Sequence, residues 1–157
     1  GPTEIRVATD EQERERLWAG RKGVLGALGR LAPNYYLVDG TIPRTKLVDV
    51  LRQINDLSEK SGYRIANLLH AGDGNLHVNI IKGKMSDQDW STKLHYGIRE
   101  IFQLTKKLGG TISGEHGIGF VQKDYIEIVL SQKNIEIQKG IKKLFDPNEI
   151  LNPGKIF

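Results

Sequence analysis

The stretch YRIANLLHAGDGNLHVNII, residues 63–81, predicts two β-strands joined by a tight turn. Its two apolar runs, residues 63–69 and 76–81, flank a polar, glycine-rich centre, which is typical of a hairpin. The dipeptide Asp73-Gly74 favours a two-residue type I′ turn at that centre. Because the turn type sets the strand register, the sequence also predicts which residues face each other across the hairpin.

This register would place His70 directly opposite His77 on one face of the hairpin. Opposed residues have Cβ atoms about 4.5–5.5 Å apart, so both imidazoles could meet one metal ion at about 2.0–2.1 Å. The sequence contains no cysteine, so any metal here must take nitrogen and oxygen ligands. The alternative is a hairpin whose two histidines stack or form hydrogen bonds without a metal.

A third ligand is most readily supplied by the glycine-rich stretch GTISGEHGIG, residues 110–119, which contains Glu115 and His116. In an extended segment neighbouring side chains point opposite ways, so one of the pair could bind the metal while the other faces a different group. The alternative is a loop whose glycines only permit turns, with Glu115 in the first turn of a following helix. His95, on a predicted helix, is interpreted as structural.

Around the hairpin the pattern predicts an α+β fold with the order β-α-β-β-α and a short last strand. This is the ferredoxin-like split βαβ arrangement with an antiparallel sheet, followed by C-terminal helices and a tail of turns. The expected elements outside the hairpin are a strand at 35–38, a helix from Pro43 to Gly62, a helix from Ser86 to Leu108, a short strand at 111–113, and helical periodicity at 121–129 and 137–144.

A further helix is predicted at residues 11–31, where Asp10 and Glu13 form a capping box. Arg21 falls on its apolar stripe and is a candidate anion ligand, although an arginine at the edge of that stripe could also extend its head into solvent. Glycines recur at every third position from 20 to 29, and each costs about 1 kcal/mol in a helix interior. Either another backbone packs closely there or the helix is broken.

The composition favours one globular domain: 157 residues, with a formal net charge of +4. No basic run exceeds a pair, so nucleic acid is not expected as a partner. No apolar stretch approaches the roughly 20 residues of a membrane span. The start, Gly1-Pro2-Thr3, lacks an initiator methionine, so residues 1–9 are interpreted as a tag remnant or ragged start. The absence of cysteine suits a cytoplasmic location.

Five motifs together resemble the C-terminal part of FAD-linked 2-hydroxy acid oxidoreductases, flavoproteins of the vanillyl-alcohol-oxidase-like family. The motifs are LWAGRK, YYLVDGTIPR, HAGDGNLH, GGTISGEHGIG and LFDPNEILNPGKIF. The similarity runs from about Leu17 to Phe157. The family includes D-lactate dehydrogenase and the FAD-binding subunit of bacterial glycolate oxidase, and LWAGRK and DGTIPR most resemble the latter. The resemblance implies that residues 10–157 form a cap and substrate domain, inactive alone, and that a separate N-terminal domain holds most of the FAD.

The resemblance also implies roles for individual residues: a divalent metal, zinc in preference, on His70, His77 and Glu115; a general base, His116; a ligand for the substrate carboxylate, Arg21; and a flavin contact, Asn152. Some relatives carry further polar substrate ligands near Leu25 and Leu37, so the apolar residues here favour a small substrate such as glycolate or D-lactate. The implied reaction is hydride transfer to FAD, which yields a 2-oxo acid.

Two other classes of function share features with this sequence. A zinc hydrolase would use the same two histidines and glutamate with an activated water and would need no flavin. A ferredoxin-like module for RNA or small ligands would need exposed aromatics on the central strands, and residues 64–69 and 76–81 contain none. The partners that the resemblance implies are a small 2-hydroxy acid, the N-terminal FAD domain and other oxidase subunits, through which the protein could lie at a membrane surface.

Overall fold

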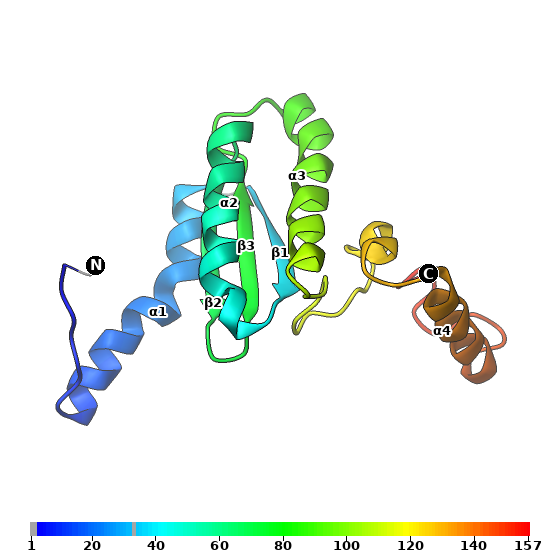
Figure 1. The fold of residues 1–157 in the computed structure, drawn as a ribbon, viewed down its shortest axis with the longest axis horizontal. Helices are drawn as coiled ribbons and strands as arrows, with labels where there is room; N and C mark the ends of the chain where they lie inside the picture. The colour runs from blue at the N-terminus through cyan, green and yellow to red at the C-terminus, as the bar shows by residue number, and fades with distance from the viewer. Residues whose placement is uncertain (1–2, 33) are drawn as a thin grey trace. The chain divides into compact units, whose positions relative to one another are not determined.

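The computed structural model describes residues 3–32 and 34–157 (Figure 1). The chain divides into two compact units, Gly1–Tyr35 and Tyr36–Phe157. The elements, in chain order, are α1 (Glu11–Leu31), β1 (Tyr35–Thr41), the 3-10 helix η1 (Arg44–Lys46), α2 (Leu47–Ser61), β2 (Arg64–His70), β3 (Asn75–Ile81), α3 (Asp87–Lys107), the 3-10 helix η2 (Lys123–Ile128) and α4 (Gln132–Phe145).

The sheet of the second unit is antiparallel, and β3 lies between β1 and β2. Every residue of this central strand is buried. The predicted α+β class and the β-α-β-β-α order are confirmed. The predicted last strand is reduced to one antiparallel bridge between Thr111 and Thr41 of β1, because the chain turns away after Thr111.

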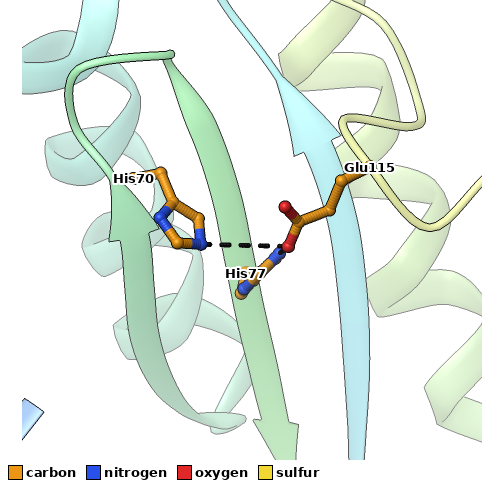
Figure 2. A group of neighbouring side chains, drawn as sticks. All are labelled: His70, His77 and Glu115. Carbon is orange, nitrogen blue, oxygen red and sulfur yellow. Dashed lines mark ion pairs between the residues drawn. The ribbon is translucent and has the colours of Figure 1, made fainter. Parts of the chain in front are cut away.

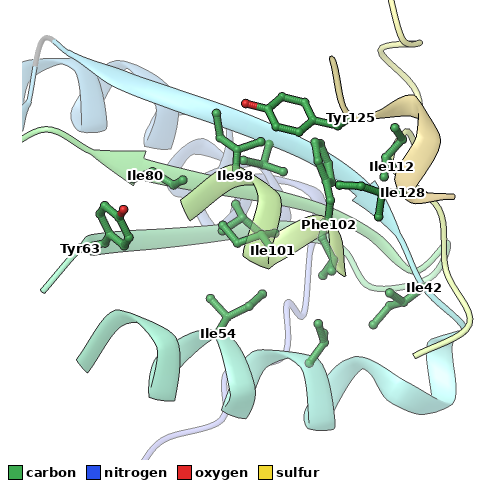
Figure 3. Packing of buried hydrophobic residues seen from close by; sticks show 14 residues of the cluster. Ile42, Ile54, Tyr63, Ile80, Ile98, Ile101, Phe102, Ile112, Tyr125 and Ile128 are labelled. Atoms are coloured by element: carbon green, nitrogen blue, oxygen red, sulfur yellow. The ribbon is translucent and has the colours of Figure 1, made fainter. Parts of the chain in front are cut away.

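The core of this unit lies between the sheet and the helices α2 and α3 (Figure 3). Val50 and Ile54 of α2 and Phe102 of α3 are completely shielded from solvent. Tyr125 of η2 extends the core, since its ring centroid lies 5.3 Å from that of Phe102. The packed sheet therefore holds its three strands as fixed neighbours, and the candidate site is built on these strands and on the glycine-rich loop that follows Thr111.

The helix ends match the signals in the sequence. The side chain of Ser86 accepts a hydrogen bond from the amide of Asp89 at the start of α3. Gly62 ends α2 in the left-handed conformation that glycine favours, with φ of 74°. None of the helices in residues 3–32 and 34–157 combines the length and the apolar character needed to cross a lipid bilayer.

The first unit contains the α1 helix, which begins at the predicted cap: Asp10 accepts from the amide of Glu13. The helix is continuous, and a methyl group added at any of its four glycines would meet no neighbouring atom within 4 Å. Within the described residues, then, neither close packing nor a helix break accounts for the glycine pattern. Of the residues of α1, only Leu28 is buried.

The segment after the glycine-rich loop was predicted as helical, and it forms η2 rather than an α-helix, followed by α4. The tail then consists of turns, as predicted. The carboxylate of Asp146 accepts hydrogen bonds from the amides of Ile150 and Leu151, each 3.0 Å long. Near the end of the tail, the amide of Ile156 donates to the carbonyl of Gly119 at 2.7 Å, which ties the tail to the glycine-rich loop.

Candidate functional site

The hairpin between β2 and β3 is wider than predicted. His70 pairs with Asn75, and Leu68 pairs with His77, so the predicted direct pairing of the two histidines is wrong. Four residues, 71–74, form the turn. The physical reason lies in the turn itself: the amides of Asp73 and Gly74 both donate hydrogen bonds of 3.0 Å to the carbonyl of His70, which closes a four-residue turn.

The two histidines nevertheless share one face of the sheet. The register differs from the predicted one by two residues, and side chains alternate with a period of two, so the facing direction is unchanged. His70 and His77 are now diagonal neighbours, with ring centroids 5.5 Å apart and planes 88° apart. The requirement that both imidazoles reach a common point is therefore met in a different register.

Glu115 joins the two histidines from a distant part of the chain (Figure 2). Its Oε1 atom lies 2.9 Å from Nε2 of His77 and 3.8 Å from Nε2 of His70. One ligand atom from each of the three residues lies within 4.8 Å of the others. The structure thus brings together the three residues that the sequence marked as metal ligands.

The arrangement of these atoms fits a cation. Nε2 of His77 is buried and has no hydrogen-bond partner among the residues that the structure describes, although Oε1 of Glu115 lies 2.9 Å away. Burial lowers the pKa of His77, and this outweighs the opposing effect of the carboxylates of Glu115 and Asp39. A neutral imidazole is the form that binds metals. His70 and Glu115 are partly open to solvent, which leaves access from one side.

His116 lies beside this trio. Its ring centroid is 5.0 Å from that of His77, and its Nε2 atom is 3.7 Å from Oε1 of Glu115. Glu115 and His116 were expected to point opposite ways, and this expectation is wrong. The segment is bent rather than extended, so both side chains turn toward His77.

Asp39 holds this bend, and it is not among the site residues predicted from the sequence. Its Oδ2 atom accepts hydrogen bonds from the Ser113 hydroxyl (3.0 Å) and from the amides of Gly114 (2.8 Å), Glu115 (3.1 Å) and His116 (3.0 Å). Burial alone would raise the pKa of Asp39, but these hydrogen bonds outweigh it and hold the pKa below its ordinary value of 3.8. The carboxylate is therefore charged at neutral pH.

The strand predicted at 35–38 ends before Asp39. Instead β1 continues to Thr41, and Asp39 lies inside it, 1% exposed. An aspartate buried within a strand needs hydrogen-bond partners for its carboxylate. This requirement is the one signal that could have marked Asp39 as part of the site. The partners themselves lie more than seventy positions further along the chain, so the sequence alone does not identify them.

The remaining candidates belong to other segments of the chain. Arg21 lies on α1 in the first unit, where it is half-buried, and its role as a carboxylate ligand stays a prediction. Asn152 is exposed in the tail with φ of 50° and lines a cavity of about 380 Å³ with Lys139 and Lys155. Its flavin contact also stays a prediction. Nδ1 of His95 lies 2.9 Å from the hydroxyl of Tyr125, consistent with its structural interpretation.

Comparison with known proteins gives the family. The family described as "FAD linked oxidases, C-terminal domain" matches residues 1–156, so the chain belongs to it. The chain is 43% identical over 155 residues to the glycolate oxidase subunit GlcD of Escherichia coli K12, covering 99% of this chain and 31% of that protein. The resemblance drawn from the five motifs is confirmed.

Other relatives agree. The chain is 39% identical to the glycolate oxidase subunit GlcD of Bacillus subtilis, covering 98% of this chain and 32% of that protein. It is 32% identical to the D-lactate dehydrogenase of Anaerostipes hadrus, covering 99% of this chain and 33% of that protein. The chain therefore spans about a third of the length of the curated relatives it matches.

Proposed function

We propose that residues 10–157 are the metal- and substrate-binding part of a flavin-dependent enzyme that oxidises a small 2-hydroxy acid, such as glycolate or D-lactate, to the 2-oxo acid. One observation carries the proposal: ligand atoms of His70, His77 and Glu115 converge within 4.8 Å beside His116. The names of the relatives, glycolate oxidase subunit and D-lactate dehydrogenase, support the substrate class. The rest of the polypeptide would hold most of the FAD.

His70, His77 and Glu115 would hold a divalent cation, with zinc preferred because two imidazoles and a carboxylate suit it. Three protein ligands leave a position open, and the exposed side of the trio faces solvent, where a substrate can enter. A cation bound there would supply Lewis acidity that lowers the pKa of a hydroxyl group beside it.

The other residues would bind the substrate and move its proton. Arg21 would bind the substrate carboxylate through two parallel hydrogen bonds, which fixes the orientation of the acid. His116, half-exposed and next to Glu115, would accept the hydroxyl proton at Nε2, a contribution typically worth about 10²–10⁴-fold in rate. The α-hydrogen would leave as hydride for FAD. Asn152 would contact the flavin from the tail.

The metal part is tested on this chain by elemental analysis after dialysis against zinc. We expect about one zinc ion per chain in the parent and none in His77→Ala, because removal of the central ligand leaves only two ligands. His95→Ala is the matched control, since it removes an imidazole outside the site. Zinc retained by His77→Ala at the parental level would refute the assignment.

The reaction is tested in the complete polypeptide that carries this domain. Its flavin absorbance should bleach on addition of glycolate or D-lactate. His116→Ala should keep flavin and zinc while losing turnover, because only the proton acceptor is removed. Bleaching at the parental rate by His116→Ala would remove this residue from the role of base.

The hydrolase alternative gains no support, since the relatives described above are named as oxidases and dehydrogenases. We further propose a cytoplasmic location, with association to other oxidase subunits that could bring the enzyme to a membrane surface. Fractionation of cells into soluble and membrane pools, with and without the partner subunits, tests this point.

A further inference from the structure

We propose that Asp39 is a positioning residue that aligns Glu115 and His116 with His77. The proposal rests on the proposed function, because it assigns Asp39 a part in building the same metal and proton-transfer site. Asp39 does not touch a substrate in this scheme. It acts through the two residues whose backbone it binds.

The first argument is the set of donors on a single oxygen atom. Three consecutive amides, of Gly114, Glu115 and His116, and the hydroxyl of Ser113 all donate to Oδ2 of Asp39 at 2.8–3.1 Å. Consecutive amides can reach one acceptor only if the backbone curls around it. This curl turns the side chains of both Glu115 and His116 toward His77.

The second argument is where the carboxylate is anchored. Asp39 lies in β1, the neighbour of β3, which contains His77. Its other oxygen, Oδ1, is buried and lies 3.8 Å from Nε2 of His77, and within residues 3–32 and 34–157 it has no hydrogen-bond partner. The Asp39 side chain therefore binds the loop through Oδ2 and faces the His77 imidazole with Oδ1. It thus sets the distance between the loop, which contains Glu115, and the strand β3, which contains His77.

The third argument is how tightly the loop lies on the sheet. A methyl group added at Gly114 would come within 2.5 Å of the side chains of Asn75 and Thr41. The hydroxyl of Ser113 also accepts a hydrogen bond of 2.8 Å from the amide of Gly117, which closes the loop on itself. The loop thus has little freedom to adjust if its acceptor is changed.

A charged acceptor suits this role better than a neutral one. A carboxylate only accepts hydrogen bonds, and charge-assisted bonds to it are shorter and stronger than neutral ones. An asparagine would keep the shape, but its single carbonyl oxygen would be a weaker acceptor, and its amino group would face either the loop amides or His77. Asp39→Asn is therefore a shape-conserving test.

The matched control is Asp146→Asn. Asp146 is also a buried aspartate that accepts from backbone amides, those of Ile150 and Leu151, but it lies in the tail and contacts no residue of the trio. Both variants should lower the unfolding temperature. Only Asp39→Asn should weaken zinc binding, by about 10–100-fold in calorimetric titration, as expected for loss of a group that orients metal ligands.

Two further readouts separate alignment from general stability. In Asp39→Asn saturated with Co²⁺, the visible ligand-field absorption should differ from that of the parent, because Glu115 no longer meets the ion in the same geometry. In the metal-free chain, the amides of Gly114, Glu115 and His116 should exchange with solvent faster than in the parent. Asp146→Asn should change neither readout.

The proposal stands only if zinc affinity and amide exchange both change in Asp39→Asn, and a change in one alone overturns it. A parent chain that binds no zinc would instead refute the proposed metal site. Alignment would then be decided by amide exchange and by the imidazole NMR signals of His77 and His116, which must shift in Asp39→Asn alone. Should that variant not fold, Ser113→Ala, which removes one donor to Asp39, must weaken zinc binding and speed the exchange of the same amides relative to the parent, and no change in either would overturn the proposal.

Discussion

Gly114 occupies a position where the loop and the sheet leave no room for a larger residue. An added Cβ would lie 2.5 Å from Oδ1 of Asn75 and 2.5 Å from Oγ1 of Thr41, closer than Cβ atoms normally approach. Both of those oxygens are buried and belong to strands. A substitution must therefore displace the loop rather than the sheet.

Gly114→Ala should consequently destabilise the chain by about 1–3 kcal/mol, as overpacking usually does, and should also weaken zinc binding. Chemical denaturation and calorimetric titration measure the two effects. Gly72→Ala is the control, because a Cβ at Gly72 would meet no atom within 4 Å. Equal stability of the two variants would contradict this account of the loop.

At the residue scale, the chemistry-bearing side chains could be predicted and their supporting contacts could not. His70, His77, Glu115 and His116 are conspicuous because few residue types bind metals and the chain has only four histidines. Asp39 was missed because aspartate followed by glycine is also a turn signal. Its hydrogen bonds depend on a tertiary approach that has no local signature in the sequence.

At the scale of elements, the end of α4 is secured by Asp146. The ammonium group of Lys142, through a hydrogen bond, is the main cause that lowers the pKa of Asp146, and the amides of Leu151 and Ile150 add to it. These contacts join the last turn of the helix to the tail. Residues 146–151 therefore depend on a charged carboxylate.

Acid should release this connection. The pKa of Asp146 is lower in the folded chain than its ordinary value of 3.8, so the unfolded chain takes up the proton first as the pH falls. The stabilisation is complete above that ordinary value and is lost as the pH falls through the lowered pKa. Urea denaturation of the parent and of Asp146→Asn should show a stability difference near pH 7 that shrinks by about pH 3. A difference independent of pH would contradict the prediction.

The predictions of secondary structure are correct where residues next to a helix end determine its position. The caps Asp10 and Ser86 and the stop at Gly62 correctly locate helix ends, because cap and stop residues act on the neighbouring backbone. The predicted hairpin register is wrong because the amides of Asp73 and Gly74 both bind the carbonyl of His70, which closes a wider turn than the dipeptide alone prefers. The last strand was overestimated, since Asp39 draws the chain away after Thr111.

At the scale of the whole molecule, the two units differ in how much apolar surface they bury. The helix α1 buries only Leu28, whereas α2 buries Val50 and Ile54 in the core. Hydrophobic burial supplies most helix stability in proteins, and glycines lower the intrinsic stability of α1 further. The family and the fold class could be recognised from motifs and periodicity, but this difference in burial could not. Leu17, Arg21 and Leu28 fall on one regular helical stripe, so the pattern does not tell that Leu28 alone of the α1 residues is buried.

Amide hydrogen exchange should reveal this difference in the isolated chain. Amides of residues 11–31 should exchange close to the unprotected rate, and those of 47–61 should be protected to nearly the global free energy of unfolding. Mass spectrometry of deuterium uptake measures both segments in one experiment. Equal protection of α1 and α2 would show that α1 is stabilised by more than its own buried leucine.

The trio also has a thermodynamic consequence. Two of its members lie on a hairpin and the third lies beyond α3, so an ion bound by all three would cross-link segments far apart in the chain. A denatured chain cannot hold these groups together, and ion binding would then favour the native state by mass action, by about 2.7 kcal/mol at a free concentration 100 times the dissociation constant. Because Glu115 would join its distant segment to the hairpin through the ion, the melting temperature of this domain would rise with the concentration of free zinc.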